Sequence, residues 1–256
     1  MQRAVEGRME GVFLNGKVKT DTKLYRIIPT ERLFSILENK RDALVRPKKW
    51  DDPFENLALN SPILINGQRI KLGVADDMYC QCWTRQNASD AMWRIYSNKN
   101  DGIRIRSTAG KLLGNLAASK RAKISNCFIG QVRYLNENKL KDFANTHFKD
   151  GDFKDGNVTN GNQIARTLLI KRRAFIHEKE VRLIYWSQSK EQVDNDLLFY
   201  DFDPFEIVDQ IMLHPLLNNK EADDLKQKLR EKGWTGELKH SKMYRPPRDF
   251  VFKVGR

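Results

Sequence analysis

The chain has 256 residues, and its 46 Lys and Arg against 33 Asp and Glu give a formal net charge of +13 at pH 7. It contains no apolar run of about 18 residues that could span a bilayer, and its N-terminus lacks the apolar core of a secretory signal. We therefore expect a cytoplasmic protein with a single domain over residues 1–256. The excess of positive charge indicates a polyanionic partner, unless it serves only solubility.

Several common catalytic motifs are missing from the sequence. It has no GxGxxG and no GxxxxGK[ST], which argues against a Rossmann or P-loop nucleotide site, and no GxSxG or HExxH. Its three cysteines and four histidines show no zinc-ligand spacing, so we expect no metal.

The first regular elements are expected after an N-terminal arm over residues 1–22. Residues 23–28 predict a short strand with Tyr25 and Arg26 at its centre, and Thr30 is a suitable N-cap for a helix over 31–39. A charged residue in a short strand usually points to solvent, so the strand alone assigns Arg26 no function.

The stretch from Trp50 to Glu55 reads WDDPFE. Asp52 before Pro53, with Glu55 three residues further on, is typical of a capped helix start. A divalent-metal site built from Asp51, Asp52 and Glu55 is the alternative, and it would need further ligands from elsewhere in the chain.

Aromatic and hydroxyl residues gather between Tyr79 and Arg106. We expect a strand that ends at Trp83 and Thr84, a helix capped by Ser89, and an alternating strand over 103–106. Three aromatic side chains of this stretch could stack on a ligand ring, although aromatics at helical spacing are also typical of a core. They are Trp83, Trp93 and Tyr96.

The remaining elements follow a mixed order. We expect helices over residues 108–119, 136–146, 163–174 and 221–232, a loop over 147–162, and strands over 124–134, 197–202, 207–213, 237–239 and 250–254. Residues 216–256 would thus form a C-terminal helix with closing strands. Hairpins outnumber strict strand-helix alternation, which predicts an α+β fold.

The most informative stretch is FIHEKEVRLIYW, from Phe175 to Trp186. As a strand, it would place Glu178, Glu180 and Arg182 on one face, with alternate residues about 7 Å apart. Two neighbouring carboxylates could then serve one ligand, with the arginine keeping them ionised. A salt-bridge ladder on a solvent-facing sheet is the alternative.

Four segments occur in a fixed order: LYR at 24–26, WDDPFE at 50–55, CWT with SDAMWRIYS and GIRI between 82 and 105, and HEKEVRLI at 177–184. Together they resemble a widespread bacterial family of unassigned function, often found near phage-defence and toxin-antitoxin genes. The resemblance spans residues 23 to 215. The order of an Arg, a hydroxyl residue and a late Glu-x-Glu is also similar to the Arg, Ser, Glu pattern of ADP-ribosyltransferases.

This resemblance implies a fold and a reaction. ADP-ribosyltransferases bind NAD between small antiparallel sheets, so we expect mixed, mainly antiparallel split sheets with flanking helices. Glu180 would stabilise the oxocarbenium-like transition state, and Glu178 would orient or deprotonate the nucleophile. Arg26 would bind the pyrophosphate or ribose of NAD. Thr84 or Ser97 would hold the nicotinamide ribose, and an aromatic residue among Tyr25, Trp83, Trp93 and Tyr96 would close the pocket.

The net charge favours nucleic acid over protein as the acceptor, and RNA over DNA because RNA offers exposed bases and 2′-hydroxyls. The expected contacts are Arg94, Lys99, Arg104, Arg106, Lys171, Arg172 and Arg173. We expect a toxin that is held in check by an antitoxin or inhibitor protein, a partner that the resemblance alone implies.

Two other functions stay open at this point. A metal-dependent nuclease could use Asp51, Asp52, Glu55, Glu178 and Glu180, although the usual Lys two residues after the acidic strand ligand is replaced by Glu180. A non-catalytic nucleic-acid-binding protein would gain nothing from paired glutamates in a basic groove.

Overall fold

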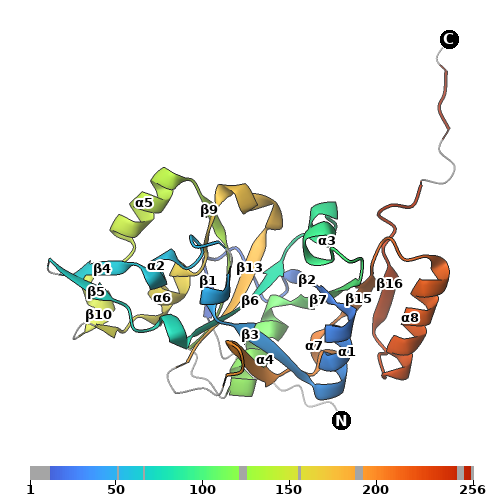
Figure 1. The fold of residues 1–256 in the computed structure, drawn as a ribbon, viewed down its shortest axis with the longest axis horizontal. Coiled ribbons are helices and arrows are strands. Elements are labelled where there is room, and N and C mark those ends of the chain that lie inside the picture. The colour runs from blue at the N-terminus through green and yellow to red at the C-terminus, as the bar shows by residue number, and fades with distance from the viewer. Residues whose placement is uncertain are drawn as a thin grey trace.

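The structure is a computed structural model that describes residues 12–50, 52–65, 67–120, 126–154, 157–187, 193–246 and 251–254. Its fold is α+β, with one large sheet and flanking helices, as the order of elements predicts (Figure 1). None of the helices in these ranges has the length and apolar character that crossing a bilayer requires.

Ten strands form the main sheet, in which most neighbours are antiparallel and the pairs β1 with β8 and β15 with β16 are parallel. Its path is β1-β8-β13-β6-β2-β7-β15-β16, and β3 branches from β6 to carry β14. The strands are β1 (Val12–Leu14), β2 (Lys23–Pro29), β3 (Arg41–Val45), β6 (Met78–Thr84), β7 (Gly102–Thr108), β8 (Cys127–Gln131), β13 (Glu180–Trp186), β14 (Leu197–Asp201), β15 (Gln210–Leu213) and β16 (Glu237–His240).

Three short two-stranded ladders lie outside the main sheet. They are β4 (Pro62–Ile65) with β5 (Gln68–Lys71), β9 (Arg133–Leu135) with β12 (Ile170–Arg172), and β10 (Phe153–Lys154) with β11 (Asn157–Val158). The helices are α1 (Thr30–Asn39), α2 (Leu57–Asn60), α3 (Asp90–Tyr96), α4 (Ala109–Lys120), α5 (Glu137–Thr146), α6 (Gly161–Thr167), α7 (Pro204–Ile207) and α8 (Asn219–Glu231).

The main sheet is almost divided between β2 and β6. β2 pairs with β7 along its whole length, and β6 pairs with β13 along its whole length. Between β2 and β6, by contrast, the described residues form one register pair, Tyr25 with Thr84. The two strands therefore diverge on either side of this pair. Because the pair still joins them, the structure has one continuous sheet where the sequence predicted split sheets.

Two apolar clusters cover the sheet. The larger cluster packs α1 and α4 against the strands through residues such as Leu33, Ile36, Leu112 and Leu116, all fully buried or nearly so. The smaller cluster packs α6 and the region of α2 against β8 and β13. α8 lies at one end of the molecule and α5 near the other (Figure 1).

Several predicted elements are confirmed, including the strand over 23–28, the helices over 31–39 and 136–146, and the helix that Ser89 caps. The Ser89 side chain accepts a hydrogen bond from the Met92 backbone amide, and Asn136 caps α5 in the same way. Thr30 does not cap α1, because it lies inside the helix and its hydroxyl donates to the carbonyl oxygen of Asp101 instead.

The prediction around the focal glutamates is wrong in its boundaries. The helix expected over 163–174 ends at Thr167, because residues 170–172 form β12 and pair with β9. A 3-10 helix then spans Arg173–Glu178. Lys179 adopts a left-handed conformation with φ of 44°, so β13 begins only at Glu180. Glu178 and Glu180 thus lie on different elements.

Three smaller predictions are also corrected. Pro53 to Asn56 form a turn, and the short helix α2 starts only at Leu57. Residues 204–207 are helical, so the strand expected from 207 starts at Gln210. Residues 251–254 form no strand, and Phe250 lies outside the described residues, as do residues 1–11 of the N-terminal arm.

Candidate active site

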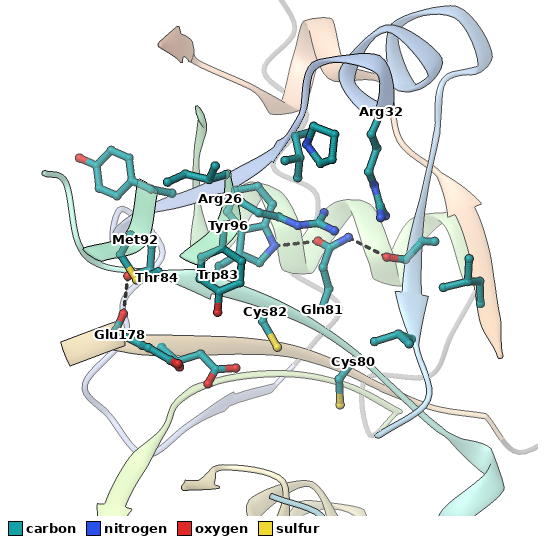
Figure 2. Close-up of a pocket in the computed structure, with 18 residues that line it drawn as sticks. Arg26, Arg32, Cys80, Gln81, Cys82, Trp83, Thr84, Met92, Tyr96 and Glu178 are labelled. Atoms are coloured by element: carbon teal, nitrogen blue, oxygen red, sulfur yellow. Dashed lines mark hydrogen bonds between the residues drawn. The ribbon is translucent and has the colours of Figure 1, made fainter. Parts of the chain in front are cut away.

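A pocket of about 400 Å³ opens where β2 and β6 diverge (Figure 2). β2 and β6 form two of its walls, and α3 contributes Met92 and Tyr96. The 3-10 helix before β13 contributes Glu178, and the first residue of β13 is Glu180. Seven residues singled out from the sequence line this one pocket. They are Tyr25, Arg26, Trp83, Thr84, Tyr96, Glu178 and Glu180.

Arg26 stands on the β2 wall, held by the buried carboxylate of Asp42. Its Nη1 lies 2.7 Å from Asp42 Oδ2, and Arg32 Nη2 lies 2.9 Å from the other carboxylate oxygen. Burial alone would raise the pKa of Asp42, but the two guanidinium groups outweigh it and lower that pKa. One buried anion therefore faces two cations, which leaves a net positive charge on this wall.

The Trp83 side chain is fixed by the same network. Trp83 Nε1 donates to Gln81 Oε1 at 2.7 Å, and Gln81 Nε2 donates to Asp42 at 2.9 Å. The Arg26 guanidinium lies 5.9 Å from the centre of the Trp83 ring, within cation–π range. Tyr96 is 44% exposed and forms the outer part of the pocket.

The opposite wall is a buried charge cluster, defined here as Glu55, Lys171, Glu178, Glu180 and Arg182. The Lys171 ammonium lies 2.6 Å from Glu178, 3.1 Å from Glu55 and 3.3 Å from Glu180. Figure 2 shows Glu178 on the other side of the pocket from Arg26 and Arg32. Three carboxylates share two cations in the cluster, so this wall is net negative.

Arg182 is fully buried and fixes the position of Glu180. Its Nε lies 2.7 Å from Glu180 Oε1, its Nη2 also contacts Glu55, and its Nη1 donates to the Leu168 carbonyl oxygen at 2.7 Å. Burial would raise the pKa of Glu180, but Arg182 and Lys171 outweigh it and hold that pKa at about 2. Glu180 is therefore ionised at neutral pH although it is buried.

Glu178 has the opposite tendency. Burial raises its pKa, the negative charges of Glu180 and Glu55 add to the rise, and Lys171 offsets only part of it. The backbone of the 3-10 helix is tied to β6, because the Thr84 hydroxyl donates to the Glu178 carbonyl oxygen. Two neighbouring carboxylates of different proton affinity therefore face one pocket, which is an arrangement typical of acid-base sites.

The sequence did not predict the roles of four residues on which this geometry depends. Arg32, Asp42 and Gln81 were not assigned to the site, and Lys171 was not expected to pair with the glutamates. Lys171 was expected on the surface because it belongs to a run of three cations. Glu55 was interpreted as a helix cap, and the absence of a helix at Pro53 frees its side chain to point inward. No local pattern marks Asp42, which binds Arg26, or Gln81, which binds Asp42; the pairing of strands brings them together.

Two residues proposed for the ligand lie outside this pocket. Trp93 is buried on another face of α3, where its ring meets His214 edge-on at 5.0 Å. Ser97 is buried at the end of α3, and its hydroxyl accepts a hydrogen bond from the Gly102 amide at 2.7 Å. Thr84 is therefore the hydroxyl residue of the two that reaches the pocket.

The residues expected to contact nucleic acid fall into two groups. Lys171 and Arg104 are buried, which corrects their assignment as surface contacts. Lys171 serves the charge cluster, and Arg104 stacks on Tyr25 at 4.7 Å with its pKa lowered to about 10, mainly by burial. The other five have exposed or half-buried side chains: Arg94, Lys99, Arg106, Arg172 and Arg173. Arg94, Arg106 and Arg172 also pair with Asp90, Glu237 and Asp52.

The carboxylates do not form a metal site. Across the described ranges no group of three or more His, Cys, Asp or Glu is placed to hold a metal ion, and Asp51 lies outside those ranges. The Lys171 ammonium contacts Glu55, Glu178 and Glu180 and occupies the position that a cation would take between them. The donor set therefore fits an internal ammonium ion rather than a divalent metal.

Comparison with known proteins gives a partial family match. Residues 92–183 match a family described as "Protein of unknown function (DUF2971)". No curated protein matches the chain. Similar solved structures include Thermus sp. 2.9 DarT in complex with NAD+, with ADP-ribosylated ssDNA and with carba-NAD+. Each is 10% identical, covers 88% of this chain and 98%, 96% and 97% of its own, and has a TM-score of 0.39, 0.39 and 0.37 respectively.

Proposed function

We propose that the chain is a toxin-like ADP-ribosyltransferase that transfers ADP-ribose from NAD to nucleic acid, with RNA as the favoured acceptor. One observation carries the proposal. An ionised, buried glutamate and an arginine face each other across a single pocket, with Glu180 on one wall and Arg26 on the other. A dinucleotide with an anionic pyrophosphate and a ribose that becomes cationic matches this separation of charge.

Glu180 supplies the catalytic charge in this proposal. Breaking the bond between the ribose C1′ and the nicotinamide nitrogen leaves the electron pair on nicotinamide and develops positive charge on the ribose. A fixed carboxylate beside the ribose stabilises that charge without having to reorganise. Glu180 is held in this way by Arg182 at 2.7 Å and by Lys171 at 3.3 Å.

Glu178 serves as the base for the incoming nucleophile. A base works best when its pKa lies near the working pH, and burial beside two other carboxylates moves the pKa of Glu178 upward in that direction. The proton of the attacking hydroxyl or amine passes to its carboxylate as the new bond to C1′ forms. Lys171 at 2.6 Å keeps this carboxylate next to Glu180.

The remaining pocket residues bind NAD. Arg26 and Arg32 offer two guanidinium groups whose planar donors suit pyrophosphate oxygens. Thr84, Trp83 and Tyr96 line the pocket. In this proposal Thr84 binds the nicotinamide ribose, and the two aromatic side chains stack on the nicotinamide ring. The substrate completes this pocket, and no metal is needed.

The choice of nucleic acid as the acceptor rests on the charge of the chain. The chain carries a net charge of +13, and in this proposal the exposed cations Lys99 and Arg173 contact the acceptor. Single-stranded DNA, which one DarT structure contains in ADP-ribosylated form, is the alternative acceptor. Modification of cytoplasmic nucleic acid would harm the host cell, so an inhibitor protein belongs to the proposal.

The proposal is tested with NAD labelled in its adenylate part and separate pools of RNA, single-stranded DNA and protein, each with and without EDTA. We expect EDTA-resistant label in RNA, reduced at least about 100-fold by Glu180→Gln. Glu231→Gln on α8, an exposed glutamate at the far end of the molecule, is the matched control and should keep full activity. Label confined to protein would overturn the acceptor, and EDTA-sensitive cleavage of RNA without NAD would favour a nuclease.

A further inference from the structure

A second hollow of about 480 Å³ lies between β9, α5 and α6, separate from the pocket described above. Its lining combines two arginines, Arg133 and Arg166, with amide side chains and the ring pair Phe143 and His147. No Asp or Glu belongs to this lining. The hollow is therefore a basic, polar site rather than an apolar groove.

Its two arginines lack carboxylate partners within the described part of the chain. Arg26, Arg46 and Arg182 each pair with Asp or Glu, whereas no ion pair involves Arg133 or Arg166. Both side chains are exposed. A guanidinium at the wall of a hollow, with no ion-pair partner among the described residues, can bind an external anion.

Asp152, whose charge acts on His147, is turned inward. Asp152 is buried, its Oδ1 accepts from Asn160 Nδ2 at 2.7 Å, and its Oδ2 accepts from the Lys149 amide at 2.9 Å. Its two oxygens are thus engaged inside the protein. It orders the loop before α6 without neutralising the arginines that line the hollow.

The ring pair Phe143 and His147 lines the hollow together with the arginines. Phe143 and His147 stack at 4.2 Å, and His147 Nε2 is bound to the Gln163 carbonyl oxygen at 2.8 Å. Burial lowers the pKa of His147, and the charges of Arg166 and Arg133 lower it further. His147 therefore stays neutral at pH 7, and both guanidinium groups lie close enough to it to be felt.

Hydrogen bonds connect this hollow to the edge of the active-site pocket. Arg85 follows Thr84 directly, is exposed, and donates from Nη1 to Gln131 Oε1 at 3.1 Å. Gln131 in turn accepts from Asn15, a lining residue of the hollow, at 2.7 Å. Arg85 has no carboxylate partner among the described residues either. Arg85, beside the catalytic pocket, is therefore linked through Gln131 to a residue that lines the hollow.

We propose that the hollow bounded by Arg133 and Arg166 binds backbone phosphates of the single-stranded acceptor nucleic acid, which reaches the active site past Arg85. This inference rests on the proposed function for its acceptor class. The phosphodiester backbone is common to RNA and DNA, so both should use the site. The phosphates fix the position of the strand and leave the choice of the modified base to the active-site pocket.

Binding of fluorescent RNA and single-stranded DNA 12-mers of equal sequence tests the inference, with NAD omitted so that no transfer occurs. Compared with wild type, the double variant Arg133→Gln, Arg166→Gln should weaken binding about tenfold or more. The slope of log affinity against log salt should become shallower by about 1.4, because two phosphate contacts are lost at about 0.7 each for single strands.

Two control variants make the outcome specific. Lys220→Gln, Lys228→Gln removes the same charge from two exposed positions of α8, at the opposite end of the molecule, and should leave the slope unchanged. Arg133→Lys, Arg166→Lys keeps the charge and should keep the slope near the wild-type value. The inference would be overturned if the arginine double variant behaved like the α8 double variant. It would also be overturned if the arginine double variant weakened binding of a free mononucleotide but not of the 12-mers.

The same variants separate this inference from the proposed function. With NAD present and no nucleic acid, cleavage of NAD should be equal in wild type and Arg133→Gln, Arg166→Gln, because neither arginine lines the active-site pocket. If the wild type never consumes NAD, the proposed function fails while the binding measurement still decides whether the hollow holds nucleic acid.

Discussion

Tyr25 on β2 and Thr84 on β6 form the register pair at which the two parts of the main sheet meet. Beyond this pair the strands separate, and their side chains become the walls of the pocket instead of neighbours in a ladder. The two sides of the pocket carry opposite charge there, since Arg26 and Arg32 lie on one side and Glu178 and Glu180 on the other. The division of the sheet therefore creates both the cavity and its electric field.

Lys171 should be essential for stability although it belongs to a run of three surface-like cations. Lys171→Met would leave Glu55, Glu178 and Glu180 buried with Arg182 as the one remaining cation of the cluster, at a cost of about 3 to 5 kcal/mol in the free energy of unfolding. Urea unfolding monitored by circular dichroism measures this loss.

Arg172→Met is the matched control for that experiment. Arg172 pairs with Asp52, but its side chain is 45% exposed, so we expect a loss below about 1 kcal/mol. Equal losses of unfolding free energy in the two variants would show that the ion pairs of Lys171 stabilise the fold no more than that of Arg172. The charge cluster would then not be the source of the site's rigidity.

The choice between Thr84 and Ser97 can be made by kinetics. Thr84→Val should raise the KM for NAD about 3- to 10-fold through loss of one hydrogen bond to the ligand, and it also removes the bond to the Glu178 carbonyl oxygen. Thr84→Ser keeps the hydroxyl and should keep KM near the wild-type value. Ser97→Ala should leave KM unchanged and reduce the free energy of unfolding by about 1 to 3 kcal/mol, because the buried Gly102 amide loses its acceptor. The reverse pattern would move the ribose site to the end of α3.

Local patterns predicted those elements whose stability is local. The strand over 23–28 is rich in β-prone residues and ends at a proline, and Ser89 caps its helix as predicted. The same reasoning failed for residues 170–178, where an apparent helix and strand give way to β12 and a 3-10 helix. There the pairing of β12 with β9, a partner far away in sequence, decides the conformation.

The candidate site shows the same limit. Arg26, Thr84 and the two glutamates can be named from sequence because each lies in a short, distinctive motif. Asp42 and Lys171 cannot, since a buried anion that holds Arg26 and an inward-pointing lysine in a cationic run have no local signature. Burial depends on which strands meet, and this information is spread over the whole chain.

Glu178 should set the acidic limb of the pH–rate profile for transfer. Its pKa is raised above the ordinary value of 4.5 by burial and by neighbouring carboxylates, so kcat/KM for transfer should rise with pH through a value above 4.5. Glu178→Gln should remove this limb and lower transfer by about 100- to 10,000-fold. NAD cleavage without acceptor should change only a few-fold, and its loss to the same extent as transfer would mean that Glu178 does not act on the nucleophile.

Glu180 should make the protein more sensitive to acid than its carboxyl count alone suggests. Its pKa is lowered from 4.5 to about 2 in the folded state, so its contribution to stability is complete above pH 4.5 and is lost as the pH falls toward 2. The difference corresponds to about 3 kcal/mol. Glu178, with a raised pKa, contributes in the opposite sense, and its contribution falls as the pH rises through its folded-state value.

Urea unfolding of wild type and Glu180→Gln between about pH 3 and about pH 6 measures this contribution. The free energy of unfolding of the wild type should rise with pH more steeply than that of Glu180→Gln, so the gap between the two narrows toward low pH. Glu178→Gln should leave the steep part of the curve in place. Parallel curves for wild type and Glu180→Gln would mean that Arg182 and Lys171 do not hold this carboxylate ionised, and the electrostatic basis of the proposed reaction would be lost.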